Sequence, residues 1–74
     1  MKSLQLTAVV ESEDDGYVSL CPELDIASQG GTVEEATANL KEAVELFLEC
    51  APREELDRRY RAQVFITRFE AAYA

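Results

Sequence analysis

The sequence predicts a small α+β domain in which three strands, one main helix and a fourth strand follow one another along the chain. Three observations support this β-β-β-α-β fold class. Short segments before residue 30 alternate apolar with polar side chains, which is the period of a half-buried strand. Residues 33–50 repeat their apolar side chains at the spacing of an amphipathic helix. Residues 62–70 are rich in β-branched and aromatic side chains, which favour a strand.

The three N-terminal strands are expected at residues 4–10, 17–21 and 26–29, as an antiparallel meander. Leucine, alanine and valine occupy the even positions of the first strand, and mostly polar residues the odd ones. In the second strand, Val18 and Leu20 fall on one face. The third strand is short enough to form an edge of the sheet.

Turn residues separate these strands. The acidic run ESEDDG ends in Asp14, Asp15 and Gly16, and an Asp-Gly pair readily adopts the positive φ angles of a tight hairpin turn. Pro22 ends the second strand because proline cannot donate a hydrogen bond to a neighbouring strand. The sequence PELD then predicts a turn into the third strand.

The stretch SQGGTVEEA, residues 28–36, marks the change from strand to helix. Gly30 and Gly31 are expected to release the chain from the strand, because glycine turns freely in either direction. The Thr32 hydroxyl is expected to cap the helix while the Glu35 carboxylate reaches back to a free amide, which is a capping box.

The main helix is expected to end near Cys50, because Pro52 disfavours helical geometry at Ala51. Its buried face is predicted to contain Ala36, Leu40, Ala43, Val44, Phe47 and Leu48. Its exposed face is predicted to contain Glu34, Lys41, Glu42, Glu45 and Glu49. Residues 52–61 then predict a short helical turn and a polar connection.

The last strand is apolar on both faces. Val64 and Ile66 point one way, and Phe65 and Phe69 point the other way, as in a strand that is covered on both sides. Because strand-helix-strand crossovers are right-handed, this strand is expected to run parallel to the first strand at its open edge. The result is a four-stranded mixed sheet with one helix on one face, a truncated version of the ribonuclease H arrangement.

A single helix covers only one face of this sheet, so the surplus apolar face of the last strand needs a partner. The tail, residues 71–74, can fold back over it, or a second copy of the chain can cover it. We expect a homodimer or higher homo-oligomer with Phe65 and Phe69 in the interface, since pairing also protects an open sheet edge.

The charge is unevenly distributed along the 74 residues. Residues 1–52 carry two lysines and eleven acids, a balance of −9, and residues 53–74 carry five arginines and four acids, a balance of +1, which together give the net charge of −8. An acidic body repels nucleic acid and attracts basic proteins. Its simpler role is to keep the protein in solution.

The composition limits the compartment and the chemistry. No apolar run is long enough for a membrane span, and the N-terminus lacks the pattern of a signal peptide, so a cytoplasmic protein is expected. Cys21 and Cys50 are then expected to be reduced, small and partly buried. Two cysteines without any histidine make a poor metal site, so we expect no metal and no cofactor.

Nothing in the sequence predicts an enzyme. Ribonuclease H chemistry needs carboxylates that hold magnesium at the central strand, whereas the first strand offers the apolar and hydroxyl side chains of residues 6–9 there. Turn geometry explains Asp14 and Asp15 more simply than catalysis does. There is no P-loop and no cysteine-histidine pair.

Residues 14–49, DDGYVSLCPELDIASQGGTVEEATANLKEAVELFLE, resemble the N-terminal domain of HicB-type antitoxins. That family joins an acidic-Gly-Tyr hairpin, a Pro-Glu-Leu turn, a Ser-Gln-Gly-x-Thr junction and a helix of the Glu-Ala…Asn-x-Lys-Glu-Ala kind. The matching positions are Gly16, Tyr17, Pro22, Glu23, Leu24, Ser28, Gln29, Gly30, Thr32, Glu35, Ala36, Asn39, Lys41, Glu42 and Ala43. The resemblance implies a partial ribonuclease H fold without nuclease activity. It also implies inhibition of a small basic HicA-like toxin that cleaves messenger RNA.

Two departures from the family pattern matter. Asp25 stands where the family commonly has proline, so this turn is expected to differ in shape. The chain also stops at Ala74 without the DNA-binding element that usually follows, so DNA binding is not expected. The residues predicted to contact a basic partner are Asp14, Asp15, Glu34, Glu42 and Glu45. The alternative function is a stand-alone oligomeric module of the same fold that binds a ligand or partner other than a toxin.

Overall fold

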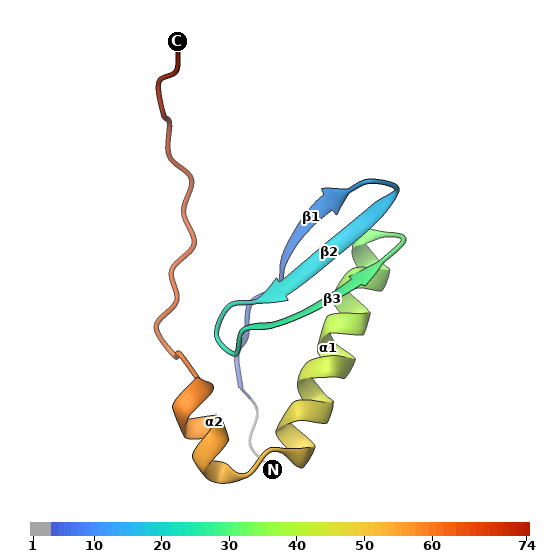
Figure 1. Ribbon diagram of the computed structural model, residues 1–74, viewed down its shortest axis with the longest axis vertical. Helices are drawn as coiled ribbons and strands as arrows, with labels where there is room; N and C mark the ends of the chain where they lie inside the picture. The colour runs from blue at the N-terminus through green and yellow to red at the C-terminus, as the bar shows by residue number, and fades with distance from the viewer. Residues whose placement is uncertain (1–3) are drawn as a thin grey trace.

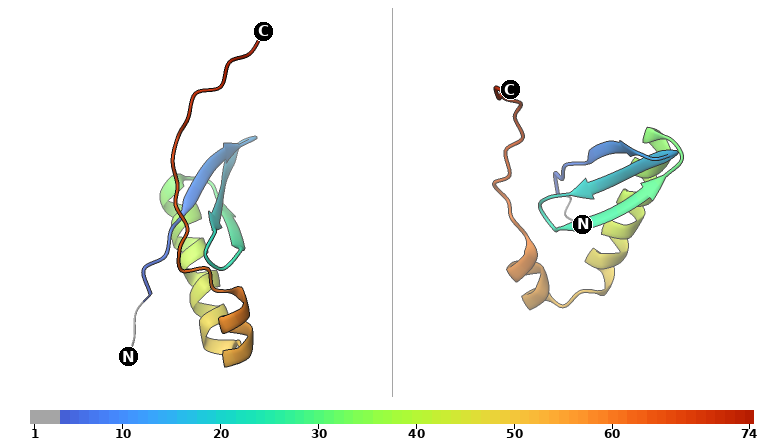
Figure 2. Two further views of the ribbon diagram at one scale, coloured as in Figure 1. Left: turned by 90° about the vertical axis from the view of Figure 1, so that its left-hand side faces the viewer. Right: turned by 45° about the horizontal axis from the view of Figure 1, so that its top comes forward.

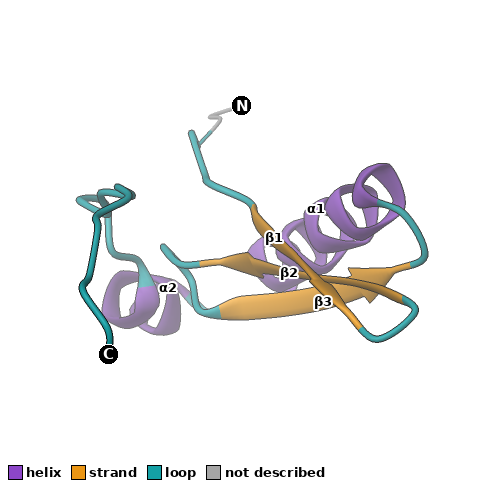
Figure 3. Cartoon of the chain, turned by 90° about the horizontal axis from the view of Figure 1, so that it is seen from above, coloured by secondary structure: helices purple, strands orange, loops and turns teal. Residues whose placement is uncertain are grey.

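Helix α1 covers one face of a three-stranded antiparallel sheet, and a second, short helix leads into a long C-terminal segment (Figure 1). The computed structural model describes residues 4–74. Its elements are β1 (Val9–Glu13), β2 (Gly16–Cys21), β3 (Ile26–Gly30), α1 (Val33–Cys50) and α2 (Arg53–Arg59). The strand order is β1-β2-β3, and the view from above shows the sheet and α1 as two layers (Figure 3). The predicted α+β class and the antiparallel meander are confirmed.

The first strand lies later in the chain than predicted. β1 includes the residues of the acidic run up to Glu13, while residues 4–8 are extended but unpaired. The reason is the length of β2, which ends at Cys21 before Pro22, so its pairing with β1 extends only from Gly16 opposite Glu13 to Leu20 opposite Val9. The positive φ angle of the hairpin turn is at Asp14 (53°), not at the predicted Asp15-Gly16 pair.

The two faces of the sheet differ from the pattern that the apolar residues of β2 indicate. Leu20 pairs with Val9 and Ala27, and it is 38% exposed on the face away from α1. Its neighbour Ser19 faces α1, where it is buried and donates a hydrogen bond to the carbonyl oxygen of Ala36 at 2.9 Å. The helix therefore packs against a small polar side chain at this point, and the apolar core begins two residues further along β2, at Cys21.

The core lies between the end of β2, the turn that follows it and the middle of α1. Cys21, Leu24, Leu40 and Val44 form the buried cluster, and these side chains are at most 6% exposed. The partly buried side chains packed around it are Leu6, Ile26, Phe47, Leu48, Leu56 and Tyr60. The apolar face predicted for the helix is confirmed, with Ala36 also buried.

The junction between β3 and α1 confirms the predicted cap and corrects the role of the glycines. Thr32 is the N-cap, and its hydroxyl accepts a hydrogen bond from the Glu35 amide at 3.0 Å. The Glu35 carboxylate accepts from the Gly31 amide at 2.7 Å, one residue earlier than in a capping box. Neither glycine has a positive φ angle. Gly30 is required because a Cβ atom there would lie 2.5 Å from the Ala36 nitrogen.

Helix α2 is held beside the β2–β3 turn. The Arg59 side chain donates to the carbonyl oxygen of Asp25 at 3.1 Å and lies over the Phe47 ring, 5.0 Å from its centroid. The Arg61 amide donates to the carbonyl oxygen of Glu23 at 2.8 Å. Asp25 has a φ angle of 56°, which proline cannot adopt, so this turn has a shape that the proline of the HicB pattern would not allow.

The predicted fourth strand is not part of the sheet. Residues 62–74 leave α2 as an extended segment that runs clear of β1 and past the β1–β2 hairpin (Figures 1 and 2). Within residues 4–74 the sheet has three strands rather than the predicted four. Of the side chains that were expected to be covered on both faces, Phe65, Ile66 and Phe69 are exposed and Val64 is half-buried.

Candidate partner-binding surface

The hairpin acids lie beside the start of α1. Asp14 and Asp15 form the two-residue turn between β1 and β2, and both are exposed. A shallow hollow of about 550 Å³ separates the hairpin from the helix. It is lined by Glu13, Asp14, Asp15, Gly16, Tyr17, Val18, Gln29, Gly30, Gly31, Glu35 and Asn39. The structure therefore brings Asp14 and Asp15 together with Glu35, which the sequence predicted only as a capping residue.

The remaining predicted acids lie along α1. Glu34, Glu42 and Glu45 are exposed, and the sequence spacing puts them with Glu49 on one side of the helix. From Glu34 to Glu49 this stripe is about 22 Å long, at 1.5 Å per residue. We call Glu34, Glu42, Glu45 and Glu49 the acidic stripe.

The acidic stripe has no cationic partners among residues 4–74. Both salt bridges in this part of the chain lie within α2, between Arg53 and Asp57 and between Arg59 and Glu55. Lys41 is the single cation of the sequence between residues 4 and 52, and it makes no salt bridge there. The negative charge of the β-β-β-α body is therefore left for another molecule or for solvent.

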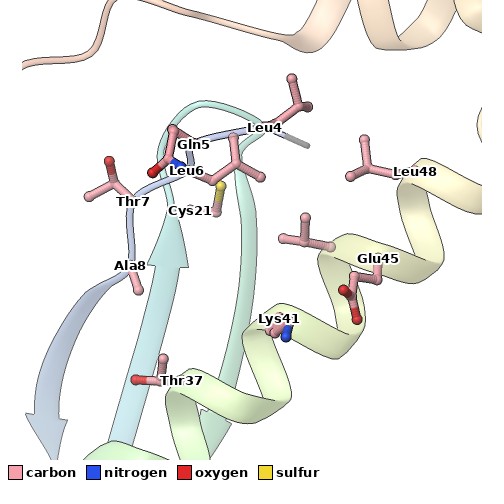
Figure 4. A pocket seen from close by; sticks show the side chains of 11 residues that line it. Leu4, Gln5, Leu6, Thr7, Ala8, Cys21, Thr37, Lys41, Glu45 and Leu48 are labelled. Atoms are coloured by element: carbon pink, nitrogen blue, oxygen red, sulfur yellow. The ribbon is translucent and has the colours of Figure 1, made fainter. Parts of the chain in front are cut away.

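A largely apolar groove lies next to the acidic stripe, between α1 and residues 4–8, and the stripe residue Glu45 is part of its lining (Figure 4). It has a volume of about 550 Å³, and we call it the β1 groove. Its lining residues are Leu4, Gln5, Leu6, Thr7, Ala8, Cys21, Thr37, Lys41, Val44, Glu45 and Leu48. The alternation of Leu4, Leu6 and Ala8 was the sequence signal for it, although that alternation was interpreted as a paired strand.

Glu23 is a buried carboxylate that sequence reasoning did not identify as important. It is 5% exposed and accepts hydrogen bonds from the Thr7 hydroxyl at 2.6 Å and from the Thr7 amide at 3.1 Å. Burial acts to raise the pKa of Glu23, but the two hydrogen bonds from Thr7 outweigh burial, and the pKa is lowered. Glu23 thus fixes residues 4–8, one wall of the β1 groove, to the turn after β2.

The two cysteines have different surroundings. Cys21 is buried and its thiol contacts the Glu23 carboxylate at 3.5 Å, while Cys50 is exposed rather than partly buried as expected. Burial raises the pKa of Cys21, and the neighbouring Glu23 carboxylate raises it further. Among residues 4–74, no group of three or more side chains is arranged to hold a metal ion.

The side chains predicted to form an interface between copies are almost fully exposed. Phe65 is 87% and Phe69 is 86% exposed, and in the same segment Ile66 is 58% and Tyr73 96% exposed. In the described part of the chain, neither helix is both long and apolar enough to cross a membrane.

The fold is that of a small α+β protein with a three-stranded sheet and two helices, and comparison with known proteins places it in a family. The chain is 37% identical over 70 residues to a UPF0150 protein of Helicobacter pylori, a match that covers 93% of this chain and 97% of that protein. The chain belongs to the UPF0150 family.

Two UPF0150 proteins of Synechocystis match a shorter region. One is 49% identical over 47 residues, which are 61% of this chain and 65% of that protein. The other is 49% identical over 45 residues, which are 58% of this chain and 57% of that protein. The chain thus matches less than two thirds of either Synechocystis relative. No protein-family model matches the chain, and no solved structure matches it significantly.

Proposed function

We propose that this protein is an antitoxin-like inhibitor that binds a small basic RNA-cleaving protein and covers its RNA-binding surface. The observation that carries the proposal is the acidic stripe together with the hairpin acids, because none of these exposed carboxylates forms a salt bridge among residues 4–74. The resemblance of residues 14–49 to HicB-type antitoxins names the class of partner.

Electrostatic attraction is the reason that the acidic stripe suits a basic RNA-cleaving protein. A protein that cleaves RNA needs a basic face for the phosphate backbone, and that face attracts an acidic protein surface as well. At physiological ionic strength the screening length is about 8 Å, which is shorter than the acidic stripe of about 22 Å. The stripe therefore acts as an extended patch that offers several carboxylates to one partner.

The partial ribonuclease H arrangement is part of this proposal. It requires residues 62–70 to add a fourth strand to the sheet, which the isolated chain does not show. The apolar side chains on both sides of this segment support its addition to a sheet edge, because a strand with two apolar faces is stable only when both are covered.

The test takes any small basic protein that is encoded beside the gene for this chain and measures its rate of binding by stopped-flow fluorescence at several salt concentrations. We expect the association rate to fall as salt rises, because exposed charges are screened. Glu42→Lys should slow association further. Glu54→Lys makes the same change in net charge on α2, outside the acidic stripe, and should have a smaller effect.

A salt-independent association rate, or equal effects of Glu42→Lys and Glu54→Lys, would contradict the role of the acidic stripe. The complex must also stop RNA cleavage by the partner, which a gel assay of a labelled transcript measures. If no adjacent basic protein binds, the alternative of an oligomeric module without a toxin gains support.

A further inference from the structure

The C-terminal segment, residues 64–69, is built as a strand but has no strand beside it. It contains two valine or isoleucine side chains and two phenylalanines with one threonine and one arginine, and its phenylalanines are 87% and 86% exposed. An exposed extended segment of this composition is an aggregation hazard unless it is paired. We propose that residues 64–69 of one copy dock on the open edge of β1 in a second copy, with one set of side chains in the β1 groove.

The β1 edge is the free side of the sheet. β1 is the outermost strand in the order β1-β2-β3, so it has no strand on its outer side. At the opposite edge, the Asn39 side chain donates to the carbonyl oxygen of Gln29 in β3 at 2.8 Å, and α1 begins beside the end of β3 (Figure 1). The edge at β1 is therefore the more open place for an added strand.

Each face beside this edge has an apolar patch at the start of β1, while Glu11 and Glu13 follow Val9 on the face away from α1. On the α1 face, the apolar lining of the β1 groove includes Leu4, Leu6, Ala8, Val44 and Leu48. Figure 4 shows Leu4 and Leu6 on one side of this hollow and Leu48 on the other. On the other face, Leu20 is 38% exposed beside Val9. Because successive side chains of a strand point to opposite faces, one docked strand covers both patches at once.

The charges of donor and acceptor are opposite. The segment and its approach carry Arg61 and Arg68, while the acceptor carries Glu11 and Glu13 on β1 and both Glu45 and Lys41 in the lining of the β1 groove, a surplus of acids. The balance of charge also differs along the chain, +1 for residues 53–74 and −9 for residues 1–52. Docking of the C-terminal segment of one copy on the acidic body of another thus adds no repulsion between like charges at the contact.

The donor is assigned to a second copy because of where the segment points. The Arg61 amide is fixed to the carbonyl oxygen of Glu23, and from there the chain stands clear of β1 and ends beyond the β1–β2 hairpin (Figures 1 and 2). The C-terminal end of the segment extends past the body of its own copy (Figure 1), and Phe69 and Tyr73 are 86% and 96% exposed. Each copy has one donor and one acceptor, so two copies close a reciprocal two-fold dimer.

Sedimentation velocity on the full chain tests the assembly. We expect a dimer at micromolar concentration. Phe65→Ser/Phe69→Ser removes the donor, and Leu4→Glu/Ala8→Glu blocks the acceptor at residues that are exposed in the single chain. Each double variant should weaken dimerisation by at least about a hundredfold, because buried aromatic or apolar contacts carry most of such an interface. Leu46→Ser is the matched control, since Leu46 is 60% exposed on α1 and lies outside the β1 groove.

A mixture of the two double variants distinguishes exchange between copies from pairing within one chain. The donor variant keeps its acceptor and the acceptor variant keeps its donor, so a one-to-one mixture should form a heterodimer, identified by native mass spectrometry. Circular dichroism of each variant establishes that the fold is retained. A monomeric wild-type chain, a dimer that survives in both folded variants, or a mixture that stays monomeric would overturn the proposal.

Discussion

Glu23 joins three parts of the chain that are distant in sequence. Its carboxylate accepts from the Thr7 amide and hydroxyl and lies near the Cys21 thiol, while its carbonyl oxygen accepts from the Arg61 amide. A buried carboxylate is stable only when hydrogen bonds replace its lost hydration. One residue of the Pro-Glu-Leu turn therefore positions both the wall of the β1 groove and the start of the C-terminal segment.

The lowered pKa of Glu23 predicts a pH-dependent stability. Because the pKa in the folded state is below its ordinary value of 4.5, Glu23 contributes its full stabilisation above that value and loses it as the pH falls through the folded pKa. Glu23→Gln should lower the free energy of unfolding at neutral pH by about 1–3 kcal/mol, the cost of unsatisfied buried partners. Its stability should also fall less steeply below pH 4.5. Urea denaturation from pH 7 to pH 3 measures both effects, and a wild-type slope in the variant would contradict the prediction.

Thr32 predicts a local effect at the start of α1. Thr32→Ala removes the acceptor for the Glu35 amide and should cost about 0.5–2 kcal/mol of stability. Thr37→Ala is the control, because Thr37 lies within the helix, where its hydroxyl bonds only to the carbonyl oxygen of Val33. Since alanine is the better helix former there, that control should be neutral or slightly stabilising. Equal denaturation midpoints for the two variants would exclude a capping role for Thr32.

At the scale of the elements, structure that depends on neighbouring residues could be predicted from the sequence. Structure that depends on residues distant in the chain could not. Helix α1 followed from its apolar period and from Thr32 and Pro52, which act within one turn of the chain. The position of β1 depends instead on where β2 stops, because pairing needs a partner strand. The sequence did not determine which face of β2 packs on the helix, because that also depends on how the strands pair. In the structure Ser19, and not Leu20, faces the helix.

The candidate site likewise contains residues that local sequence patterns identify and residues that they do not. The sequence identified the acids of the hairpin and of α1 because exposed charge can be read from helical spacing alone. The role of Glu23 depends on Thr7, which is 16 residues away, and no local pattern indicates their contact. The strand predicted at residues 62–70 needs a neighbouring strand to pair with, and the described part of one chain does not supply one.

Gly30 gives a test of how β3 joins α1. Gly30→Ala should be strongly destabilising, by about 1–3 kcal/mol, because its Cβ atom would lie 2.5 Å from the Ala36 nitrogen and 2.8 Å from the Glu35 carbonyl carbon. These are backbone atoms of the helix and cannot turn aside. Gly31→Ala should be tolerated, because its nearest neighbour is the flexible Glu35 side chain at 3.6 Å. Thermal unfolding of the two variants compares them, and a Gly31→Ala variant as unstable as Gly30→Ala would contradict close packing as the cause.

At the scale of the whole molecule, the charge distribution predicts how salt affects stability. The net charge is −8, and among residues 4–74 both salt bridges lie within α2, so the acids of the body repel one another without compensation. Raising the NaCl concentration from about 0.01 M to about 0.1 M shortens the screening length from about 30 Å to about 10 Å, which is less than the length of the acidic stripe. The melting temperature should therefore rise with NaCl.

Differential scanning calorimetry of the Phe65→Ser/Phe69→Ser variant measures this rise without a contribution from assembly through the C-terminal segment. Adding Glu42→Gln and Glu45→Gln should raise the melting temperature at low salt and make it less sensitive to NaCl, because two charges of the acidic stripe are removed. Glu54→Gln/Glu70→Gln is the matched control with the same change in net charge outside the body. If both pairs of substitutions reduce the salt response equally, the repulsion arises from net charge alone. If only Glu42→Gln and Glu45→Gln reduce the rise of the melting temperature with NaCl, the repulsion arises between the carboxylates of the acidic stripe. A basic partner bound to the stripe would relieve that repulsion.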